Sequence, residues 1–148
     1  MAIVDKSTNY FNATLYTGNA SSPRTISGVG FSPDLVWNKC IDGGDHRVLD
    51  QVRGANKEFA ANRTLAEFSN NSDGNLTAFT SDGFTITAGS TNINNWNKNS
   101  DRYVSWDWKA GTSFTNSAGA NGADVASAGS VNTDAGFSIV TYSGTSAS

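Results

Sequence analysis

His46 is the only histidine of the chain, so its surroundings are the first place to look for catalysis. It follows Asp45 at the end of an Asp- and Gly-rich run, residues 42–45. Nucleophilic catalysis needs a Ser or Cys together with a His base that a carboxylate holds in place. A single histidine among polar loop residues is usually only a solvated side chain. We therefore predict no catalytic residues and no enzymatic activity.

Cleavage of a glycan needs no histidine, because two facing carboxyl groups about 5–10 Å apart are sufficient. The carboxylates that could form such a pair are Asp34, Asp50, Glu58, Glu67 and Asp107. Nothing in their spacing shows that any two of them face each other. A glycan-cleaving domain is therefore the enzymatic alternative.

Asp107 alternates with two tryptophans along a strand-like segment. On a covered face of a sheet, its charge would need a basic partner. The basic residues considered for this role are Lys39, Arg53 and Arg102. We expect a structural ion pair there rather than a functional carboxylate.

Two acceptor-rich segments, residues 42–45 and 71–75, could offer oxygen ligands to calcium. Neither closes with the bidentate Glu of a complete calcium loop, so we expect ordinary Asx-rich turns, with no metal and no cofactor. The single cysteine, Cys40, has no partner for an internal disulfide and is expected to be a packing thiol.

Trp96 is the one aromatic residue set in a run of amides, with Asn94, Asn95 and Asn97 beside it. An indole that stacks on a sugar ring while amides bind its hydroxyls would suit this composition. Two other interpretations are that Trp96 plugs the end of the fold or that it packs against a neighbouring subunit. These four residues are the candidate ligand or subunit contacts, and plugging or packing is the favoured interpretation.

The composition limits the partners of the chain. Its 148 residues suit one main domain, and only 16% of them are charged, with a net charge of -3. The ten basic residues are scattered among thirteen acids, which argues against a nucleic-acid partner. No run of about eighteen apolar residues is present, so we expect no membrane span.

Short runs of β-branched and aromatic residues, separated by turn-forming residues, predict strands over most of residues 1–110. The clearest is 103–109, where Val104, Trp106 and Trp108 share one face, which we expect to meet a deep apolar layer. Further strands are expected at 10–17 and 35–39, and a hairpin joins 76–79 to 84–87. At most one short helical turn is expected, within 51–69. The prediction is an all-β, antiparallel β-sandwich.

The remaining residues divide into two parts. Residues 111–135 hold few large apolar side chains, and we expect a linker or a surface-hugging segment there. Residues 136–148 resemble the first strand, because Phe137, Tyr142 and Gly144 match Phe11, Tyr16 and Gly18 at equal spacing. The chain thus contains the start of a second, incomplete copy, as expected of a module that is strung in series or pairs with a neighbour.

Five segments in this order resemble a domain of marine tailed-phage structural proteins, including those of cyanophages. They are residues 11–19, 26–37, 49–54, 81–84 and 103–110. The resemblance covers nearly the whole chain and implies a jelly-roll sandwich of the concanavalin or SPRY type. It supplies no catalytic residues.

The resemblance also implies a biological role. We expect a non-enzymatic structural module of a virion, in a tail fibre, spike or capsid appendage, that binds other virion proteins. A homo-oligomer is expected, with the trimer that phage fibres usually form. The alternative is a carbohydrate-binding adhesin domain that contacts a host cell-surface glycan.

Overall fold

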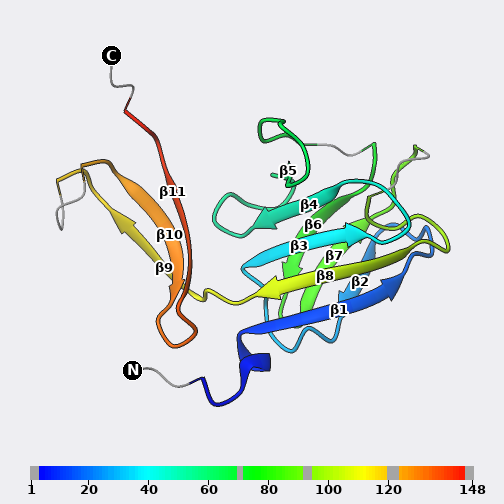
Figure 1. Ribbon diagram of the computed structural model, residues 1–148, viewed down its shortest axis with the longest axis horizontal. Coiled ribbons are helices and arrows are strands. Elements are labelled where there is room, and N and C mark those ends of the chain that lie inside the picture. Colours follow the sequence, from blue (N-terminus) through cyan, green and yellow to red (C-terminus); the bar gives the residue numbers. More distant parts are fainter. Residues whose placement is uncertain (1–3, 70–71, 92–94, 120–123, 146–148) are drawn as a thin grey trace.

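The computed structural model describes residues 4–69, 72–91, 95–119 and 124–145 and is built from strands (Figure 1). In chain order its elements are the 3-10 turn η1 (Ser7–Asn9), β1 (Phe11–Thr17), β2 (Arg24–Ser27), β3 (Leu35–Cys40), β4 (His46–Asp50), β5 (Phe59–Ala60), β6 (Asn75–Thr80), β7 (Gly83–Thr87), β8 (Arg102–Trp108), β9 (Thr112–Asn116), β10 (Ser127–Asn132) and β11 (Phe137–Tyr142). They form three antiparallel sheets, ordered β1-β8-β3-β4-β5, β2-β7-β6 and β11-β10-β9. No helix in the described part of the chain is long and apolar enough to cross a membrane.

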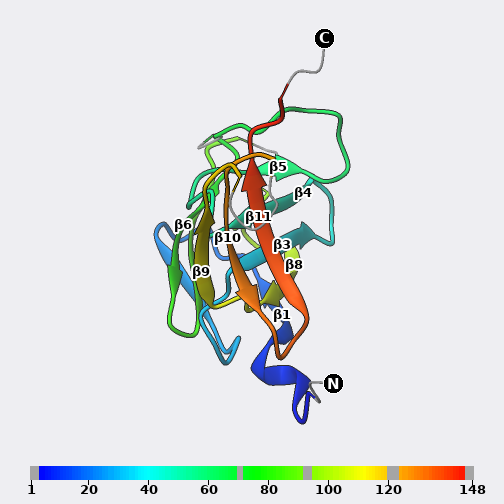
Figure 2. The same ribbon diagram turned by 90° about the vertical axis from the view of Figure 1, so that its left-hand side faces the viewer.

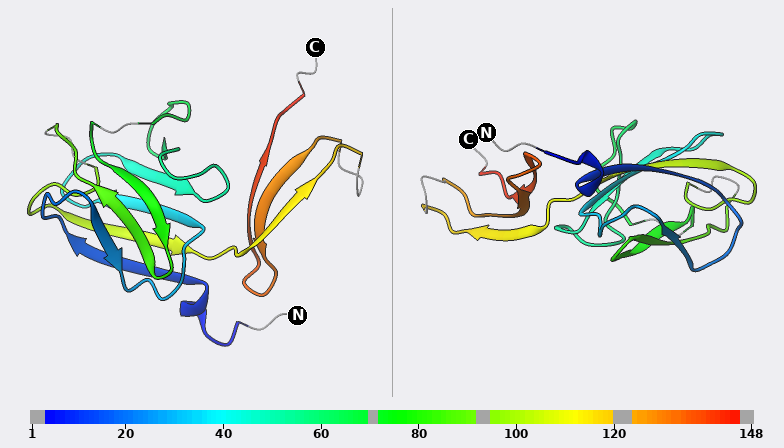
Figure 3. Two further views of the ribbon diagram at one scale, coloured as in Figure 1. Left: turned by 180° about the vertical axis from the view of Figure 1, so that it is seen from behind. Right: turned by 90° about the horizontal axis from the view of Figure 1, so that it is seen from below.

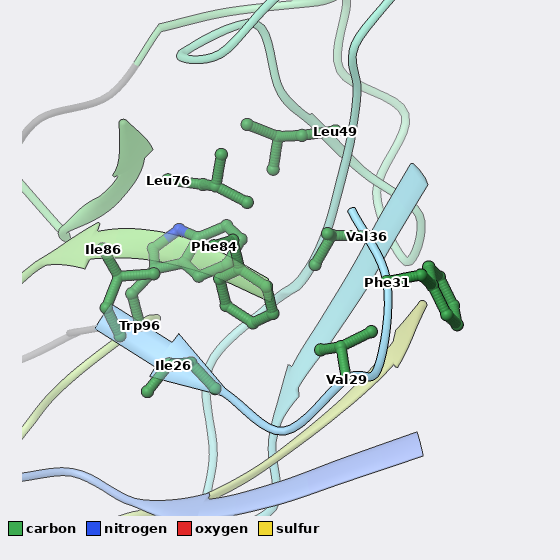
Figure 4. Close-up of a cluster of buried hydrophobic side chains, with 9 residues drawn as sticks. All are labelled: Ile26, Val29, Phe31, Val36, Leu49, Leu76, Phe84, Ile86 and Trp96. Atoms are coloured by element: carbon green, nitrogen blue, oxygen red, sulfur yellow. The ribbon is translucent and has the colours of Figure 1, made fainter. Parts of the chain in front are cut away.

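The first two sheets pack face to face as a β-sandwich, which the right-hand view of Figure 3 shows edge-on. Between them lies a single apolar cluster, drawn in Figure 4. Its members are Ile26, Val29, Phe31, Val36, Leu49, Leu76, Phe84, Ile86 and Trp96. The predicted antiparallel sandwich is confirmed, and the cluster takes its residues from strands of both sheets and from the segments that connect them.

The predicted hairpin is also confirmed, as β6 and β7 pair antiparallel with a register irregularity between Leu76 and Ala78. The Asp82 carboxylate at its turn accepts hydrogen bonds from the backbone N–H groups of Gly28, at 3.0 Å, and Gly30, at 2.6 Å. These bonds lower the pKa of Asp82 and tie the hairpin to the segment that follows β2.

The prediction for the covered face of β8 is wrong. Tyr103, Ser105 and Asp107 are fully buried between the sheets, whereas the face with Trp106 and Trp108 is half-buried and points away from the second sheet. A period of two separates the faces of a strand but does not say which one a second layer covers. The inner face tolerates polar groups because they are hydrogen-bonded there, as where the Tyr103 hydroxyl accepts from the Lys98 N–H at 2.9 Å.

At most one short helical turn was expected, and the one in the described residues is η1, near the N-terminus, whereas residues 51–69 contain β5 and a bridge between Glu58 and Phe68. Residues 111–135, for which a linker or a surface-hugging segment was expected, contain β9 and β10, which pair with β11 (Figure 2). Small residues make this sheet possible, because a Cβ at Gly129 would lie 2.7 Å from the Phe114 ring that covers it.

Candidate functional site

Trp96 is completely buried, which corrects the hypothesis that it contacts a ligand or a subunit. Its ring packs edge-on against Phe84 with centroids 6.4 Å apart, and its carbonyl accepts a hydrogen bond from the Tyr16 hydroxyl at 2.9 Å. An indole enclosed in this way has no free face for a sugar. The plugging interpretation is the one that the structure supports.

The neighbouring amides are structural as well. Asn95 is buried, and its side-chain oxygen accepts the Asp45 N–H at 2.8 Å. Asn97 is buried, and its side-chain oxygen accepts from the Asn19 N–H at 3.0 Å and from Arg24 at 2.9 Å. Asn94 lies outside the described residues. Residues 95 and 97 therefore close the end of the sandwich rather than present a binding edge.

Two of the candidate carboxylates, Asp50 and Glu67, bind the same arginine. Arg53 lies between them, at 2.6 Å from Asp50 Oδ2 and 2.8 Å from Glu67 Oε2. Asp34 is buried and accepts the Ala110 N–H at 2.8 Å, and burial raises its pKa. Each of these carboxylates thus has a structural role.

Asp107 does not form the expected ion pair. Lys39 donates to the carbonyl of Cys40, and Arg53 and Arg102 bind other carboxylates. Instead the Ser105 hydroxyl donates to Asp107 Oδ2 at 2.9 Å. Burial raises the pKa of the Asp107 carboxyl to about 7, so the group is largely protonated below neutral pH.

Arginines form ion pairs with both carboxylates of the first candidate calcium segment, residues 42–45. Arg102 binds Asp42 with its Nη2 at 2.6 Å, and this pairing lowers the pKa of Asp42 to about 2. Arg63 Nε lies 2.7 Å from Asp45. Within the described ranges, no three His, Cys, Asp or Glu side chains gather closely enough to hold a metal ion. The lone Cys40 is buried, as expected of a packing thiol.

The outer face of the five-stranded sheet carries a cluster of aromatic and aliphatic side chains, and we call it the outer aromatic surface. Its members are Phe11, Leu15, Trp37, Val104, Trp106 and Trp108, which alternate with half-buried residues of β1 and with buried residues of β3 and β8. Trp37 and Trp106 are directly opposed across β3 and β8, with ring centroids 5.7 Å apart. Leu15 is 73% exposed.

One end of this surface is covered by the chain itself. Phe137, at the start of β11, stacks on Trp108 with centroids 6.1 Å apart, and Phe11 lies 4.9 Å from the same indole. A cavity of about 450 Å³ lies beside these three rings. The part formed by Leu15, Val104 and Trp106 has no such cover among the described residues.

An apolar sheet face of this kind offers contact area to a binding partner. The family model that matches the chain is described as "Domain of unknown function (DUF7483)" and covers residues 6–148. The chain belongs to the DUF7483 family. The match includes β9 to β11, so the small sheet is part of the DUF7483 domain. No curated protein and no solved structure matches the chain.

Sequence reasoning identified part of this surface of the DUF7483 domain without recognising its role. The shared face of Val104, Trp106 and Trp108 was visible as a period of two in the sequence. The neighbouring Trp37 joins them only through the pairing of β3 with β8. Leu15 of β1 lies opposite Val104 of β8 and is exposed, which places it on the same outward face.

His46 borders the outer aromatic surface of the DUF7483 domain, and the Trp37 indole N–H donates to its Nδ1 at 3.3 Å. Burial lowers the pKa of His46, and the charge of nearby Lys39 lowers it further. We expect the midpoint of the His46 imidazole titration, followed by proton NMR, to lie below its ordinary value of about 6.5. Lys39→Met should raise that midpoint because it removes a like charge, whereas an unchanged midpoint would contradict this assignment.

Proposed function

We propose that this DUF7483 domain is a non-enzymatic structural module of a tailed-phage virion, in a tail fibre, spike or capsid appendage. It acts by assembling with copies of itself and with other virion proteins, and in this way it takes part in attachment to a host surface. The outer aromatic surface is the observation that carries the proposal. The placement on a virion draws on the resemblance of the five sequence segments.

The surface has the properties of an assembly contact. Aromatic residues are enriched at the centres of protein interfaces, where tryptophan contributes most per residue. Here three tryptophans and Phe11 lie on one rigid sheet, and only the Trp108 end is covered by Phe137. Phe11 and Leu15 are exposed there and the tryptophans are half-buried, and an apolar patch of this kind marks an interaction site or an aggregation hazard. A symmetric homo-oligomer buries it, and a trimer is the form we propose.

Leu15→Asp tests this proposal directly. Leu15 is 73% exposed in the single chain, so the substitution should leave the fold of each subunit intact, as measured by circular dichroism. A charge placed on a buried interface costs several kcal/mol, so the oligomer should dissociate to a monomer. Light scattering on the full chain measures the mass.

Leu65→Asp is the matched control, because Leu65 is 55% exposed and lies outside the sheet, in the segment after β5. It should keep the mass of the unsubstituted chain. If the unsubstituted chain is a monomer at high concentration, or if Leu15→Asp leaves its mass unchanged, assembly through this surface is wrong.

Carbohydrate binding is the second candidate function. Because Trp96 is buried, we place this binding on the outer aromatic surface instead. Trp37 and Trp106 offer indole rings, and His46 at the border offers a polar group. A host-type saccharide that binds there should raise the melting temperature in a concentration-dependent way. Trp106→Ala should abolish that rise while the oligomeric mass of the chain reports separately on assembly.

A further inference from the structure

Residues 137–144 repeat residues 11–18 at three positions with equal spacing. In the first copy each of these three residues helps to hold β1 against β8 or against the segment before it. Phe11 packs against Trp108 of β8 with ring centroids 4.9 Å apart and the ring planes tilted by 51°. Tyr16 stacks on Tyr103 of β8 at 4.9 Å, with the ring planes only 8° apart. The Tyr16 hydroxyl also donates to the buried carbonyl of Trp96 at 2.9 Å. These two aromatic rings fix both the position and the register of β1 on β8.

Gly18, the third position, ends the docked strand at a point where no larger residue fits. A Cβ there would lie 1.9 Å from the carbonyl oxygen of Lys98. The Gly18 N–H donates to the carbonyl of Asp101 at 2.7 Å, and its own carbonyl accepts from the Ser100 N–H at 2.9 Å. The glycine thus lets the chain lie against the segment that leads into β8.

The equivalent residues in and after β11 make few comparable contacts within the same chain. Tyr142 is 70% exposed, and a Cβ on Gly144 would meet nothing within 4 Å. Val140 corresponds to Thr14, whose side of β1 faces the sandwich interior, yet Val140 is 49% exposed. Phe137 alone has a comparable contact, on Trp108. The side of β11 that corresponds to the inner side of β1 is therefore turned outward.

The free edge of β11 is also open to pairing. In the described chain β11 pairs with β10 on one side and lies at the edge of its sheet. Residues 137–142 contain no charge and no proline, which are the usual devices that keep an edge strand from pairing with another chain. The backbone donors and acceptors of this edge can thus form a second ladder.

We infer that β11 is a docking strand for a second copy of this sandwich, in which it takes the seat of β1 on β8. The register of β1 on β8 places Phe137 opposite the partner copy's Trp108 position and Tyr142 opposite its Tyr103 position. This position on β8 becomes free when β1 of that copy detaches. β1 is an edge strand of its sheet, where β8 is its one hydrogen-bonded neighbour strand. Because β11 stays paired with β10, the two copies then share one continuous sheet. The inference rests on the proposed assembly function but involves exchange of a strand at the β8 edge rather than contact between the outer aromatic surfaces of two copies.

A peptide with the sequence of residues 135–145 tests the docking on the full chain carrying Phe11→Ala and Tyr16→Ala, which weaken its own β1. At about 100 times its dissociation constant, the peptide should raise the melting temperature of this variant by about 5 °C or more. A photoreactive phenylalanine analogue at the position of Tyr142, which is exposed in the chain itself, should label the tryptic fragment 103–109, which contains Tyr103. The same peptide with alanine for Phe137 and Tyr142 is the control, and an equal shift with both peptides would overturn the inference.

A second test keeps β1 intact, in case the double variant does not fold. In full chains that also carry Cys40→Ala, a Val104→Cys chain is mixed with a Thr141→Cys chain under mild oxidation. Thr141 corresponds to Leu15, which is opposite Val104, so a mixed disulfide dimer should form. Ser138→Cys is the control, because Ser138 corresponds to Asn12 on the other face of the strand.

The outcomes separate this inference from the proposed function. Mixed disulfides that form equally with Thr141→Cys and Ser138→Cys, or with neither, overturn the docking of β11. If Leu15→Asp still dissociates an oligomer in that case, assembly through the outer aromatic surface is supported without any docking of β11. If the unsubstituted chain also stays a monomer, both are wrong.

Discussion

Replacing Asp107 with asparagine should stabilise the domain at about pH 8 by about 4 kcal/mol, and should have little effect near pH 3. Asp107 is completely buried, and burial raises the pKa of its carboxyl to about 7 from the ordinary 3.8. The unfolded chain releases this proton near the ordinary value, whereas the folded chain retains it until neutral pH. Asparagine has the shape of the protonated acid and carries no charge to bury.

The sign of the pH dependence follows from these two pKa values. Between about pH 4 and pH 7 the folded state binds more protons than the unfolded state, so the stability contributed by Asp107 falls as the pH rises. Above about pH 7 both states are ionised and the loss is complete. The lowered pKa of His46 acts in the opposite direction, because its contribution is lost as the pH falls below about 6.5.

Urea unfolding at several pH values measures this effect, and the difference between Asp107→Asn and the unsubstituted chain cancels the contribution of His46. The control is Asp42→Asn. Arg102 lowers the pKa of the exposed Asp42 to about 2, so removing its charge should not stabilise the domain at any pH. A pH-independent difference for Asp107→Asn would show that Asp107 does not hold its proton in the folded state.

Gly18→Ala should destabilise the domain by about 3 kcal/mol, which lowers the melting temperature by roughly 6–12 °C. The added Cβ would lie 1.9 Å from the Lys98 carbonyl oxygen and 2.8 Å from the Lys98 carbonyl carbon. Both are backbone atoms, so the segment before β8 must move, and the bond from the Gly18 N–H to Asp101 is strained with it. Calorimetry on the full chain provides the measurement.

Gly144→Ala is the matched control, since it changes the equivalent glycine of the repeated strand. No atom lies within 4 Å of the Cβ that it would add, and the free energy of unfolding should change by less than about 0.5 kcal/mol. Equal losses for the two substitutions would contradict the structural difference between Gly18 and Gly144.

Most strands of the sandwich could be predicted from local patterns. Residues 103–109 alternate between two side-chain types, and Asp82-Gly83 marks the turn between β6 and β7, so neighbouring residues alone carry the signal. The β9–β10 pair was missed because its residues are mostly small and polar. Its pairing is made by backbone bonds and by Phe114 lying over Gly129, which local hydrophobicity does not reveal.

The candidate site shows the same division. The amides around Trp96 left a sugar contact open beside the favoured plugging or packing, and in the structure Asn95 and Asn97 form hydrogen bonds inside the fold. The outer aromatic surface was hidden because Trp37 and Trp106 come from strands that are distant in the sequence. Only strand pairing brings them together.

From the sequence alone we could predict that this chain forms antiparallel strands, where most of them lie, and that Phe137, Tyr142 and Gly144 repeat Phe11, Tyr16 and Gly18. These properties depend on alternation, turn residues and spacing, all of which are local. The tertiary structure decided which face of β8 is buried, that Asp107 lies in the interior with Ser105 instead of a cation, and that the tryptophans of β3 and β8 face outward. A strand has two faces of equal geometry, and the layer that packs on one of them is set by contacts between distant segments.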